Sequence, residues 1–97
     1  MTVKIIASIK VNPEEQDALR TYLDVTTPLL EAAGGQVVQS FEKGESVVGE
    51  LDFDRVMIVE YPNLAALDKV FKSEAYKAII PIRDKAFTRY GISVIST

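Results

Sequence analysis

The stretch "DRVMIVEYPN", residues 54–63, decides the fold because it is apolar on both of its alternating faces. In an extended strand, successive side chains point to opposite sides, so residues 55, 57, 59 and 61 share one face and residues 56, 58 and 60 share the other. A strand that is apolar on both faces is typical of the centre of a sheet. Its two charges, Arg55 and Glu60, fall on opposite faces, and neither face is an obviously solvated one. The strand is predicted to span residues 50–61.

The flanking segments predict the element order βαββαβ. Residues 2–11 alternate between apolar and polar side chains, which indicates a first strand. Asn12 is the expected N-cap of a helix that carries Pro13 in its first turn, contains Pro28 and runs to about residue 33. Gly34 and Gly35 then end the helix, one in the left-handed conformation and the other allowing a close backbone approach.

The second half of the chain repeats the pattern of a strand, helix and strand. The predicted elements are a strand over residues 36–42, its return strand over 50–61, a helix capped by Asn63, a second helical stretch that starts at Ser73 and is broken by Pro81, and a last strand over 89–96. We therefore expect one domain over residues 1–97, of the α+β class, with a four-stranded antiparallel sheet, helices on one face and a ferredoxin-like topology.

The composition excludes several functional classes. The 97 residues include no cysteine, histidine or tryptophan, which removes thiol nucleophiles, imidazole bases, zinc sites of cysteine and histidine, and histidine-bound haem. The net charge is −3 and no basic run is present, so nucleic acid is not expected as a partner. No apolar run is long enough for a membrane span, and residues 1–10 lack a signal-peptide pattern, so we predict a cytoplasmic protein without membrane contact.

Four acidic residues precede or begin the two-faced strand, and they raise the question of a metal site. Glu45, Glu50, Asp52 and Asp54 carry ligands suited to a hard cation. They alternate with apolar residues, as solvent-facing positions of an edge strand do. We therefore predict no metal site, and no cofactor is implied by any other pattern.

The two-faced strand also predicts an assembly. In the expected topology the first and third strands are central and the helices cover only one face of the sheet. The opposite face would carry Ile6 from the first strand and Val56 and Ile58 from the third. Burial of apolar surface stabilises by about 25 cal/mol per Å², so this face favours a cover, and the simplest one is a second copy of the chain. We predict a homodimer.

Three motifs resemble a known family. They are Tyr22, Pro28 and the glycine pair at their mutual spacing, "RVMIVEYP" at 55–62, and "SEAY" at 73–76 followed by Arg83. Over nearly the whole chain this pattern resembles the domain of unknown function family 1330, which belongs to the dimeric α/β barrel superfamily. The resemblance implies the same fold and a dimer, and it brings no established reaction. The chain departs from the family at Gln36, where arginine is common, and in a longer segment between Pro13 and Tyr22.

The positions that carry over from this resemblance form the candidate site. They are Tyr22, Gly34, Gly35, Arg55, Glu60, Tyr76 and Arg83. Glu60, Tyr76 and Arg83 are the candidate catalytic residues, and Tyr22, Gly34, Gly35 and Arg55 are candidate ligand-binding residues. Arginine offers a fixed fork of donors for an anion, and a buried carboxylate can act as a base. Because Arg55 and Glu60 occupy opposite faces, we expect separate roles for them rather than one shared pocket.

Two classes of function stay open at this stage. The first is a protein that binds a small acidic or enolisable metabolite in a cleft between the sheet and the helices, as an oxygenase or isomerase that acts without a metal. The second is a non-catalytic dimer that binds a ligand or a partner and uses its buried charges for structure. Fold alone cannot choose between these classes.

Overall fold

The structure is a computed structural model that describes residues 2–95. The elements in chain order are β1 (Val3–Val11), α1 (Gln16–Ala32), β2 (Gln36–Glu42), β3 (Arg55–Tyr61), α2 (Leu64–Phe71), α3 (Glu74–Ala78), α4 (Ile80–Ala86) and β4 (Phe87–Ile95). The predicted order βαββαβ is confirmed, with the second helix divided into three segments. Ser96, the last residue of the predicted final strand, lies outside the described residues.

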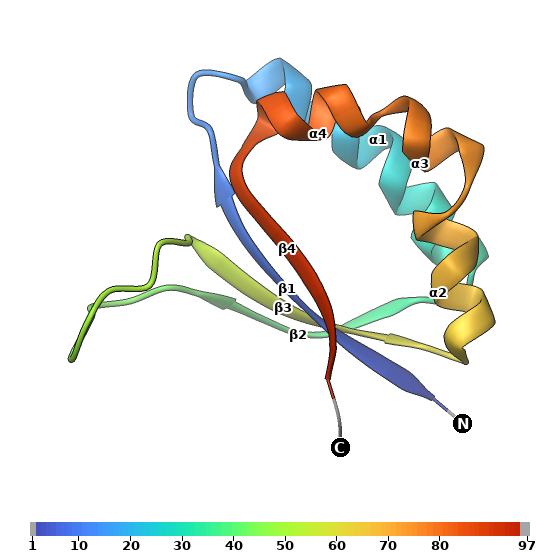
Figure 1. The fold of residues 1–97 in the computed structure, drawn as a ribbon, viewed down its shortest axis with the longest axis horizontal. Coiled ribbons are helices and arrows are strands. Elements are labelled where there is room, and N and C mark those ends of the chain that lie inside the picture. Colours follow the sequence, from blue (N-terminus) through green and yellow to red (C-terminus); the bar gives the residue numbers. More distant parts are fainter. Residues whose placement is uncertain (1, 96–97) are drawn as a thin grey trace.

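The four strands form one antiparallel sheet in the order β2-β3-β1-β4. The helices cover one face of this sheet, and α1 lies alongside α4 within the helical layer (Figure 1). The first and third strands are therefore central, as the two-faced pattern of residues 55–61 predicts. This arrangement confirms the α+β class and the four-stranded antiparallel sheet.

The strand register assigns every side chain of the sheet to one of two faces. Ile5 and Ile9 of β1 are buried toward the helices, and they pair directly with Val59 and Arg55 of β3. Side chains of directly paired residues lie on the same face. Arg55 therefore shares the face that meets the helices. Glu60 pairs with Lys4 and lies on the opposite, open face, so the predicted separation of the two charges is confirmed.

The core lies entirely between the sheet and the helices. One cluster of buried side chains joins β1 and β3 to α2, and it includes Ile5, Val59 and Tyr61. A second cluster joins β1 and β4 to α1, α3 and α4, and it includes Tyr22 and Tyr76. Since both clusters lie on the helical side, the apolar residues of the open face belong to neither of them.

The first helix starts later than predicted. Gln16 is its first residue, whereas the pattern of Asn12 and Pro13 predicts a start three residues earlier. The side chain of Asn12 accepts a hydrogen bond from the backbone N–H of Glu14, at 3.1 Å, and so closes a turn rather than capping the helix. The backbone N–H of Asn12 donates to the carbonyl of Ala86. This tertiary bond holds the start of the connection against the end of α4.

The third strand is shorter than predicted. Residues 50–54 belong to the connection between β2 and β3 instead of the strand. The carboxylate of Asp52 accepts bonds from Lys10 at 2.5 Å and from Arg89 at 2.6 Å, and Asp54 accepts one from the backbone N–H of Val11 at 3.0 Å. These contacts hold residues 50–54 against β1 and β4. The alternation of apolar and polar residues carries no information about such distant contacts, so it predicts a strand that is too long.

The glycine pair ends α1 as predicted. Gly34 has a positive φ of 81°, and its backbone N–H donates to the carbonyl of Glu31. Gly35 donates to the carbonyl of Leu30 and lies against the ring of Tyr61, so that a Cβ at this position would come within 2.8 Å of the ring. The positive φ of Gly34 is typical of a helix C-terminus, and the missing Cβ of Gly35 allows the backbone to approach the Tyr61 ring.

The capping predictions for the later helices are also confirmed. The side chain of Asn63 accepts a bond from the N–H of Ala66, and the hydroxyl of Ser73 accepts one from the N–H of Tyr76. Pro81 lies in the first turn of α4, so the helical break at Ile79 precedes the proline. Across residues 2–95, no helix combines the length and hydropathy that crossing a membrane needs.

We predict that Gly35→Ala destabilises the protein. The added methyl would lie 2.8 Å from Tyr61 and 2.9 Å from Leu30, and such overpacking typically costs about 1–3 kcal/mol. The matched control is Gly44→Ala, where nothing lies within 4 Å of the added atom. Chemical denaturation should show a lower unfolding free energy for the first variant and little change for the second. Equal stability of the two variants would contradict the close approach at Gly35.

Candidate functional site

A cleft of about 350 Å³ lies between the sheet and the helices. Its floor is formed by the helical face of the sheet, and its opposite wall by α1, with Phe71 and Tyr76 closing one side. Its rim between α1 and β2 carries Leu23 and Val37, both about half exposed. The lining is almost entirely apolar. Clefts of this size and character are typical of small-molecule sites.

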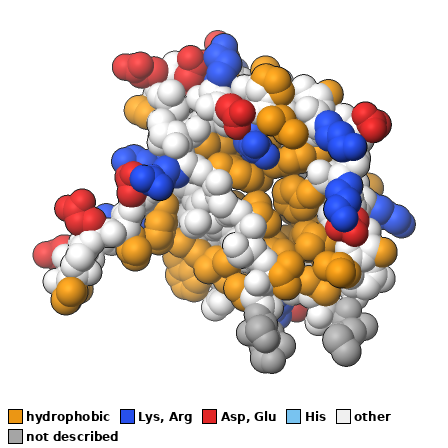
Figure 2. Space-filling view, in the orientation of Figure 1, with side chains coloured by type: hydrophobic (Ala, Val, Ile, Leu, Met, Phe, Trp, Pro, Cys, Tyr) orange, Lys and Arg blue, Asp and Glu red, His pale blue; other side chains and the backbone are white. Residues whose placement is uncertain are grey.

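A second hollow adjoins this cleft at the other edge of the sheet. It opens between α2, α4 and β4, and its lining includes Leu67, Ile80 and Arg83. Five residues line both hollows: Ile5, Phe71, Tyr76, Tyr90 and Ile92. Figure 2 shows hydrophobic side chains around a hollow between the helices and the sheet, with β4 and α4 nearest to the viewer in this orientation.

Three tyrosine hydroxyls meet beside the two hollows: Tyr76 and Tyr90 line both, and Tyr22 lines the cleft. Tyr22 of α1 lies 3.1 Å from Tyr76 and 2.5 Å from Tyr90, and Tyr76 donates to Tyr90 at 3.0 Å, all between hydroxyl oxygens. The ring of bonds closes when Tyr90 donates to Tyr22 and Tyr22 donates to Tyr76. Each hydroxyl then uses its only proton within the cluster, so the three polar groups satisfy one another in an apolar setting.

The aromatic rings of this tyrosine cluster pack edge to face. The Tyr22 ring makes interplanar angles of 75–84° with the rings of Tyr76, Phe87 and Tyr90, with centroids 5.2–6.2 Å apart. Phe71 packs on Tyr76 in the same way at 5.0 Å. Edge-to-face pairs at these distances are favourable, and each adds about 0.5–1.5 kcal/mol to the burial term. The cluster therefore holds α1, α3 and β4 together beside the cleft.

Burial raises the pKa of two phenols of the cluster, those of Tyr22 and Tyr90. It raises the pKa of Tyr22, and the neighbouring Tyr90 and Tyr76 raise it further. Burial also raises the pKa of Tyr90, with the hydrogen bond to Tyr76 adding to the effect, and it raises the pKa of Tyr61 in the adjacent core. At neutral pH the cluster is therefore an uncharged group of hydroxyls. A hydroxyl of the cluster can donate a hydrogen bond to a ligand only if one of the bonds between the tyrosines is broken.

Arg83 lies beside the tyrosine cluster and is only loosely bonded. Its Nη1 donates to the Tyr76 hydroxyl at 3.4 Å, and its other bonds go to the neighbouring Asp84 at 3.3 and 3.4 Å. The guanidinium carbon lies 5.2 Å from the Tyr90 ring centroid and 5.9 Å from that of Tyr76. Strong charged hydrogen bonds of arginine are shorter, about 2.7–2.9 Å. The side chain, 24% exposed, therefore offers donors to an incoming anion.

Arg83 also keeps its charge at this position. Burial by itself lowers the pKa of Arg83, but the hydrogen bond to Tyr76 and the contact with Asp84 raise the pKa by more. Arginine is in any case charged throughout the working range of proteins. Arg83 lines the second hollow, which adjoins the apolar cleft, so its charge lies beside apolar side chains that could contact the body of an acidic molecule.

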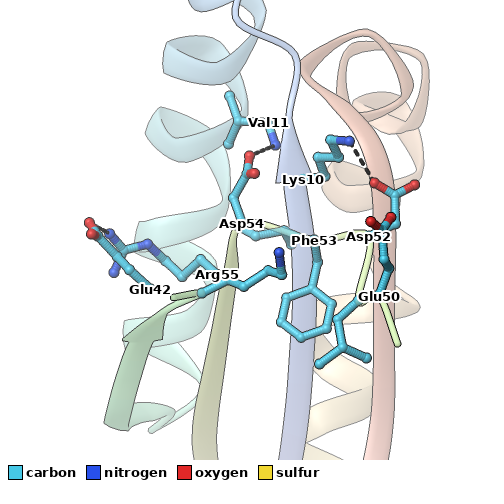
Figure 3. A pocket seen from close by; sticks show the side chains of 11 residues that line it. Lys10, Val11, Glu42, Glu50, Asp52, Phe53, Asp54 and Arg55 are labelled. Atoms are coloured by element: carbon cyan, nitrogen blue, oxygen red, sulfur yellow. Dashed lines mark hydrogen bonds and ion pairs between the residues drawn. The ribbon is translucent and has the colours of Figure 1, made fainter. Parts of the chain in front are cut away.

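Arg55 has different surroundings from Arg83. It lines the far end of the cleft, but its guanidinium donates to Ser40 at 2.8 Å and to Glu42 at 2.7 Å, both on the neighbouring β2. Figure 3 shows the charged notch that Arg55 shares with Glu42, Asp52 and Lys10, where the marked contacts run between charged side chains or to the backbone. These short bonds satisfy Arg55 within the sheet.

The carboxylates of this charged notch do not gather around a common point. Asp52 is held by Lys10 and Arg89, and these two hydrogen bonds lower its pKa. Asp54 accepts from the backbone of Val11. Within residues 2–95, no group of three or more potential ligands is placed to hold a metal ion.

The structure brings together only some of the sequence-derived candidates. Tyr76 bonds to both Tyr22 and Arg83. Arg55 lines the apolar cleft, whereas Arg83 lines the second hollow. Glu60 lies on the open face of the sheet opposite Lys4, so the sheet itself separates it from the tyrosines. The glycine pair, Gly34 and Gly35, ends α1 and does not line the cleft.

Tyr90 is the site residue that the sequence analysis did not select. It belongs to the β4 face that carries Ile92 and Val94, whereas its neighbour Arg89 pairs with Lys10 on the open face. This alternation was visible in the sequence and places Tyr90 toward the helices. Its proximity to Tyr22 and Tyr76, which lie 68 and 14 residues away in the chain, depends on tertiary packing.

A four-stranded antiparallel sheet in this strand order, with helices on one face, defines a ferredoxin-like α+β protein. Residues 3–96 match the family described as "Domain of unknown function (DUF1330)", and the chain belongs to that family. The resemblance of the three sequence motifs is thereby confirmed. No curated protein matches the chain.

Solved structures share this fold at low identity. RPA0582, a protein of unknown function from Rhodopseudomonas palustris, is 21% identical with a TM-score of 0.82, covering 99% of this chain and 82% of that one. A dimeric ferredoxin-like protein of unknown function from Bacteroides fragilis is 11% identical, with a TM-score of 0.61 and coverage of 99% and 96%. A candidate antibiotic biosynthesis monooxygenase from Caulobacter crescentus is 14% identical, with a TM-score of 0.68 and coverage of 99% and 89%. At these identities the likeness concerns the fold.

The tyrosine pKa shifts predict a loss of stability in alkali. The unfolded chain releases phenolic protons near pH 10.0, whereas folded Tyr22 and Tyr90 hold theirs to higher pH. The raised pKa values therefore contribute to the free energy of unfolding in full below about pH 10. This contribution is lost as the pH rises above the pKa of the unfolded phenols and toward that of the folded ones. Thermal unfolding between about pH 8 and pH 11 should show the decline. Tyr90→Phe, which removes one titrating group, should make the decline shallower, and an equally steep decline in this variant would contradict the prediction.

Proposed function

We propose that this protein is a homodimer that binds a small acidic or enolisable molecule in the cleft between the sheet and the helices. Arg83 holds the acidic group, and the tyrosine cluster of Tyr22, Tyr76 and Tyr90 forms the wall beside it. The observation that carries the proposal is the charged, loosely bonded Arg83 in the hollow that adjoins the apolar cleft. An apolar body and one acidic group are the features that such a site recognises.

The loose bonding of Arg83 supports anion binding over a purely structural role. A structural arginine is expected to have short bonds to acceptors within the protein, as Arg55 has with Glu42. All three bonds of Arg83 are 3.3 Å or longer, and its acceptor Asp84 is a flanking, exposed side chain. A bound carboxylate, phenolate or enolate can replace these long contacts with short, bidentate ones.

Metal-free oxygenation suits the cleft better than isomerisation does. An isomerase needs a group that moves a proton between two carbon positions. Among the described residues that line the two hollows, Asp68 is the one carboxylate, and it pairs with Lys72 at 3.5 Å. An oxygenase that acts on an enolate or phenolate needs mainly a stabilised substrate anion in a dry site, which Arg83 and the apolar walls can supply. Glu60 is not part of this proposed reaction.

The alternative is a non-catalytic dimer that binds a ligand or a partner. The short bonds of Arg55 to Ser40 and Glu42 favour a structural role for that charge. Oxygen uptake with a bound phenol or enol separates the two proposals. Uptake that requires the protein and is lost in Arg83→Ala supports an oxygenase, whereas binding without any turnover supports the alternative.

The open face of the sheet supports the homodimer. Ile6, Val56 and Ile58 form its centre, and Phe41 of the edge strand β2 is 51% exposed beside them. Lys4 of β1 and Glu60 of β3 are opposite each other at one end of this face. A second copy related by two-fold symmetry could therefore place its own lysine and glutamate against residues of opposite charge. A second copy with its sheet against this one would bury the apolar centre.

The connection between β2 and β3 supports the same assembly. Figure 1 shows it extending away from the body of the molecule. Its two adjacent valines, Val47 and Val48, are each 93% exposed, and Leu51 is 61% exposed. Apolar side chains on a projecting segment are common where a segment packs against another chain. A second copy beside the open face is a suitable partner for this projecting segment.

We predict that acidic ligands raise the melting temperature through Arg83. A ligand at about 100 times its Kd stabilises by about 2.7 kcal/mol, which for a domain of this size corresponds to about 10 °C or more. A panel of aromatic and aliphatic carboxylates and phenols should contain compounds that produce such shifts. Arg83→Ala should abolish them, and Arg20→Ala, on the exposed side of α1, should not. Unchanged melting temperatures across the whole panel would rule out the proposed site.

A charge on the open face should separate the dimer. Light scattering should give wild type twice the 10.7 kDa of the chain. Ile58→Lys places a cation at the centre of the apolar patch and should shift the mass to that of one chain while circular dichroism shows a folded protein. Leu64→Lys is the control, because Leu64 is 56% exposed on α2, away from this face. A wild-type protein that runs as a single chain at micromolar concentration would contradict the proposal.

A further inference from the structure

We infer that the ligand of this cleft is an elongated amphipathic acid, such as a medium-chain carboxylate, whose charged group lies at Arg83 and whose hydrocarbon chain passes the tyrosine cluster toward the mouth between α1 and β2. The inference rests on the proposed function and narrows its class of ligand. It depends on three features of the cleft: two adjoining hollows, one available cation and an apolar wall between the two ends.

The first feature is that the site has two mouths at opposite edges of the sheet. One hollow opens beside β4 and the other beside β2, and these are the two edge strands. They share the side chains of Tyr76, Tyr90 and Phe71 among their walls. A compact ligand would fill one hollow and leave the other to water, whereas a linear ligand can occupy both.

The second feature is the difference between the two arginines at the ends. Arg55, near the β2 mouth, is bonded at 2.7 and 2.8 Å to acceptors within the sheet. Arg83, at the β4 mouth, has contacts of 3.3 Å or more. One end therefore offers an available cation and the other does not, so a ligand with a single acidic group has a preferred direction in the cleft.

The third feature is the surface between these ends. The three hydroxyls of the tyrosine cluster bond to one another, so they place no unsatisfied donor in the path of a ligand. Most other lining side chains are apolar, such as Ile5, Ile92 and Leu30, while Thr26 and Thr27 line the cleft and Asp68 lines the hollow of Arg83. A hydrocarbon chain fits such a wall, whereas a ligand with polar groups along its length would lose their hydration without compensation.

The distance between the mouths sets the size of the ligand. Edge strands of a four-stranded sheet are three strand spacings apart, which is about 14 Å. This length suits an extended medium-chain acid of the size of octanoate or decanoate. Shorter acids would reach Arg83 without contacting the second mouth.

The test is calorimetric titration of the full chain with hexanoate, octanoate and decanoate, with benzoate as a compact acid and decanol as an uncharged chain. We expect the affinity to rise about fourfold for each added methylene that enters the cleft. Arg83→Ala should weaken the three aliphatic acids about tenfold or more and leave decanol unchanged. Arg20→Ala should change none of these affinities.

The second mouth is tested with Leu23→Glu. Leu23 is 47% exposed at the rim between α1 and β2, so the substitution should preserve folding while placing a carboxylate beside the end of the chain. Decanoate should bind about tenfold more weakly to this variant and hexanoate equally well. Leu64→Glu, equally exposed but outside the cleft, is the matched control.

The outcomes distinguish this inference from the proposed function. If benzoate binds through Arg83 but affinity does not increase from hexanoate to decanoate, the elongated ligand is excluded and the acidic site stands. If decanoate binds equally to wild type, Arg83→Ala and Leu23→Glu, it binds elsewhere and the inference fails. If no acid binds at all, in calorimetry and in the melting panel alike, the proposed function itself fails.

Discussion

The antiparallel pairing of β1 with β3 is the constraint on which the rest of the structure depends. It sets the side chains of both central strands in register, so that Ile5 and Val59 meet the helices while Ile6 and Ile58 meet the open face. One residue of slip would exchange these two sets. The floor of the cleft, the faces of Arg55 and Glu60 and the apolar patch on the open face all follow from this pairing.

The tyrosine cluster satisfies polar groups that packing of the helices on the sheet buries. Polar hydroxyls buried between sheet and helices would be costly without partners, and three of them meeting at one point remove the cost together. Their rings at the same time hold α1, α3 and β4 at the spacing that the cleft requires. Arg83 then stacks near two of these rings, where the aromatic faces favour a cation and keep it at the mouth.

The fold by itself carries little information about the reaction. Structures with this fold include proteins of unknown function and a candidate monooxygenase, although all share the same sheet and helices. The features that distinguish this chain are local: no histidine or cysteine, a neutral tyrosine cluster and one loosely bonded arginine. These features, and not the topology, are the basis for proposing an acidic ligand.

Much of the architecture could be predicted because it depends on short-range patterns. Period-two alternation identified the two-faced strand, and the caps at Asn63 and Ser73 depend on bonds that span three residues. The glycine pair after α1 is equally local, since a positive φ and a close approach are properties of those positions. The boundaries failed where a distant contact decided them, as at Asn12, whose backbone bonds to Ala86.

The sequence by itself determined the order of the elements, the faces of the strands and the residues available for chemistry, because periodicity and composition are properties of the chain alone. Only the tertiary structure decided which of those residues meet. Tyr22 and Tyr76 are 54 residues apart and their hydroxyls lie 3.1 Å apart, whereas the sheet separates Glu60 from both. The physical reason is that a site is formed by packing between elements, and packing depends on every buried side chain at once.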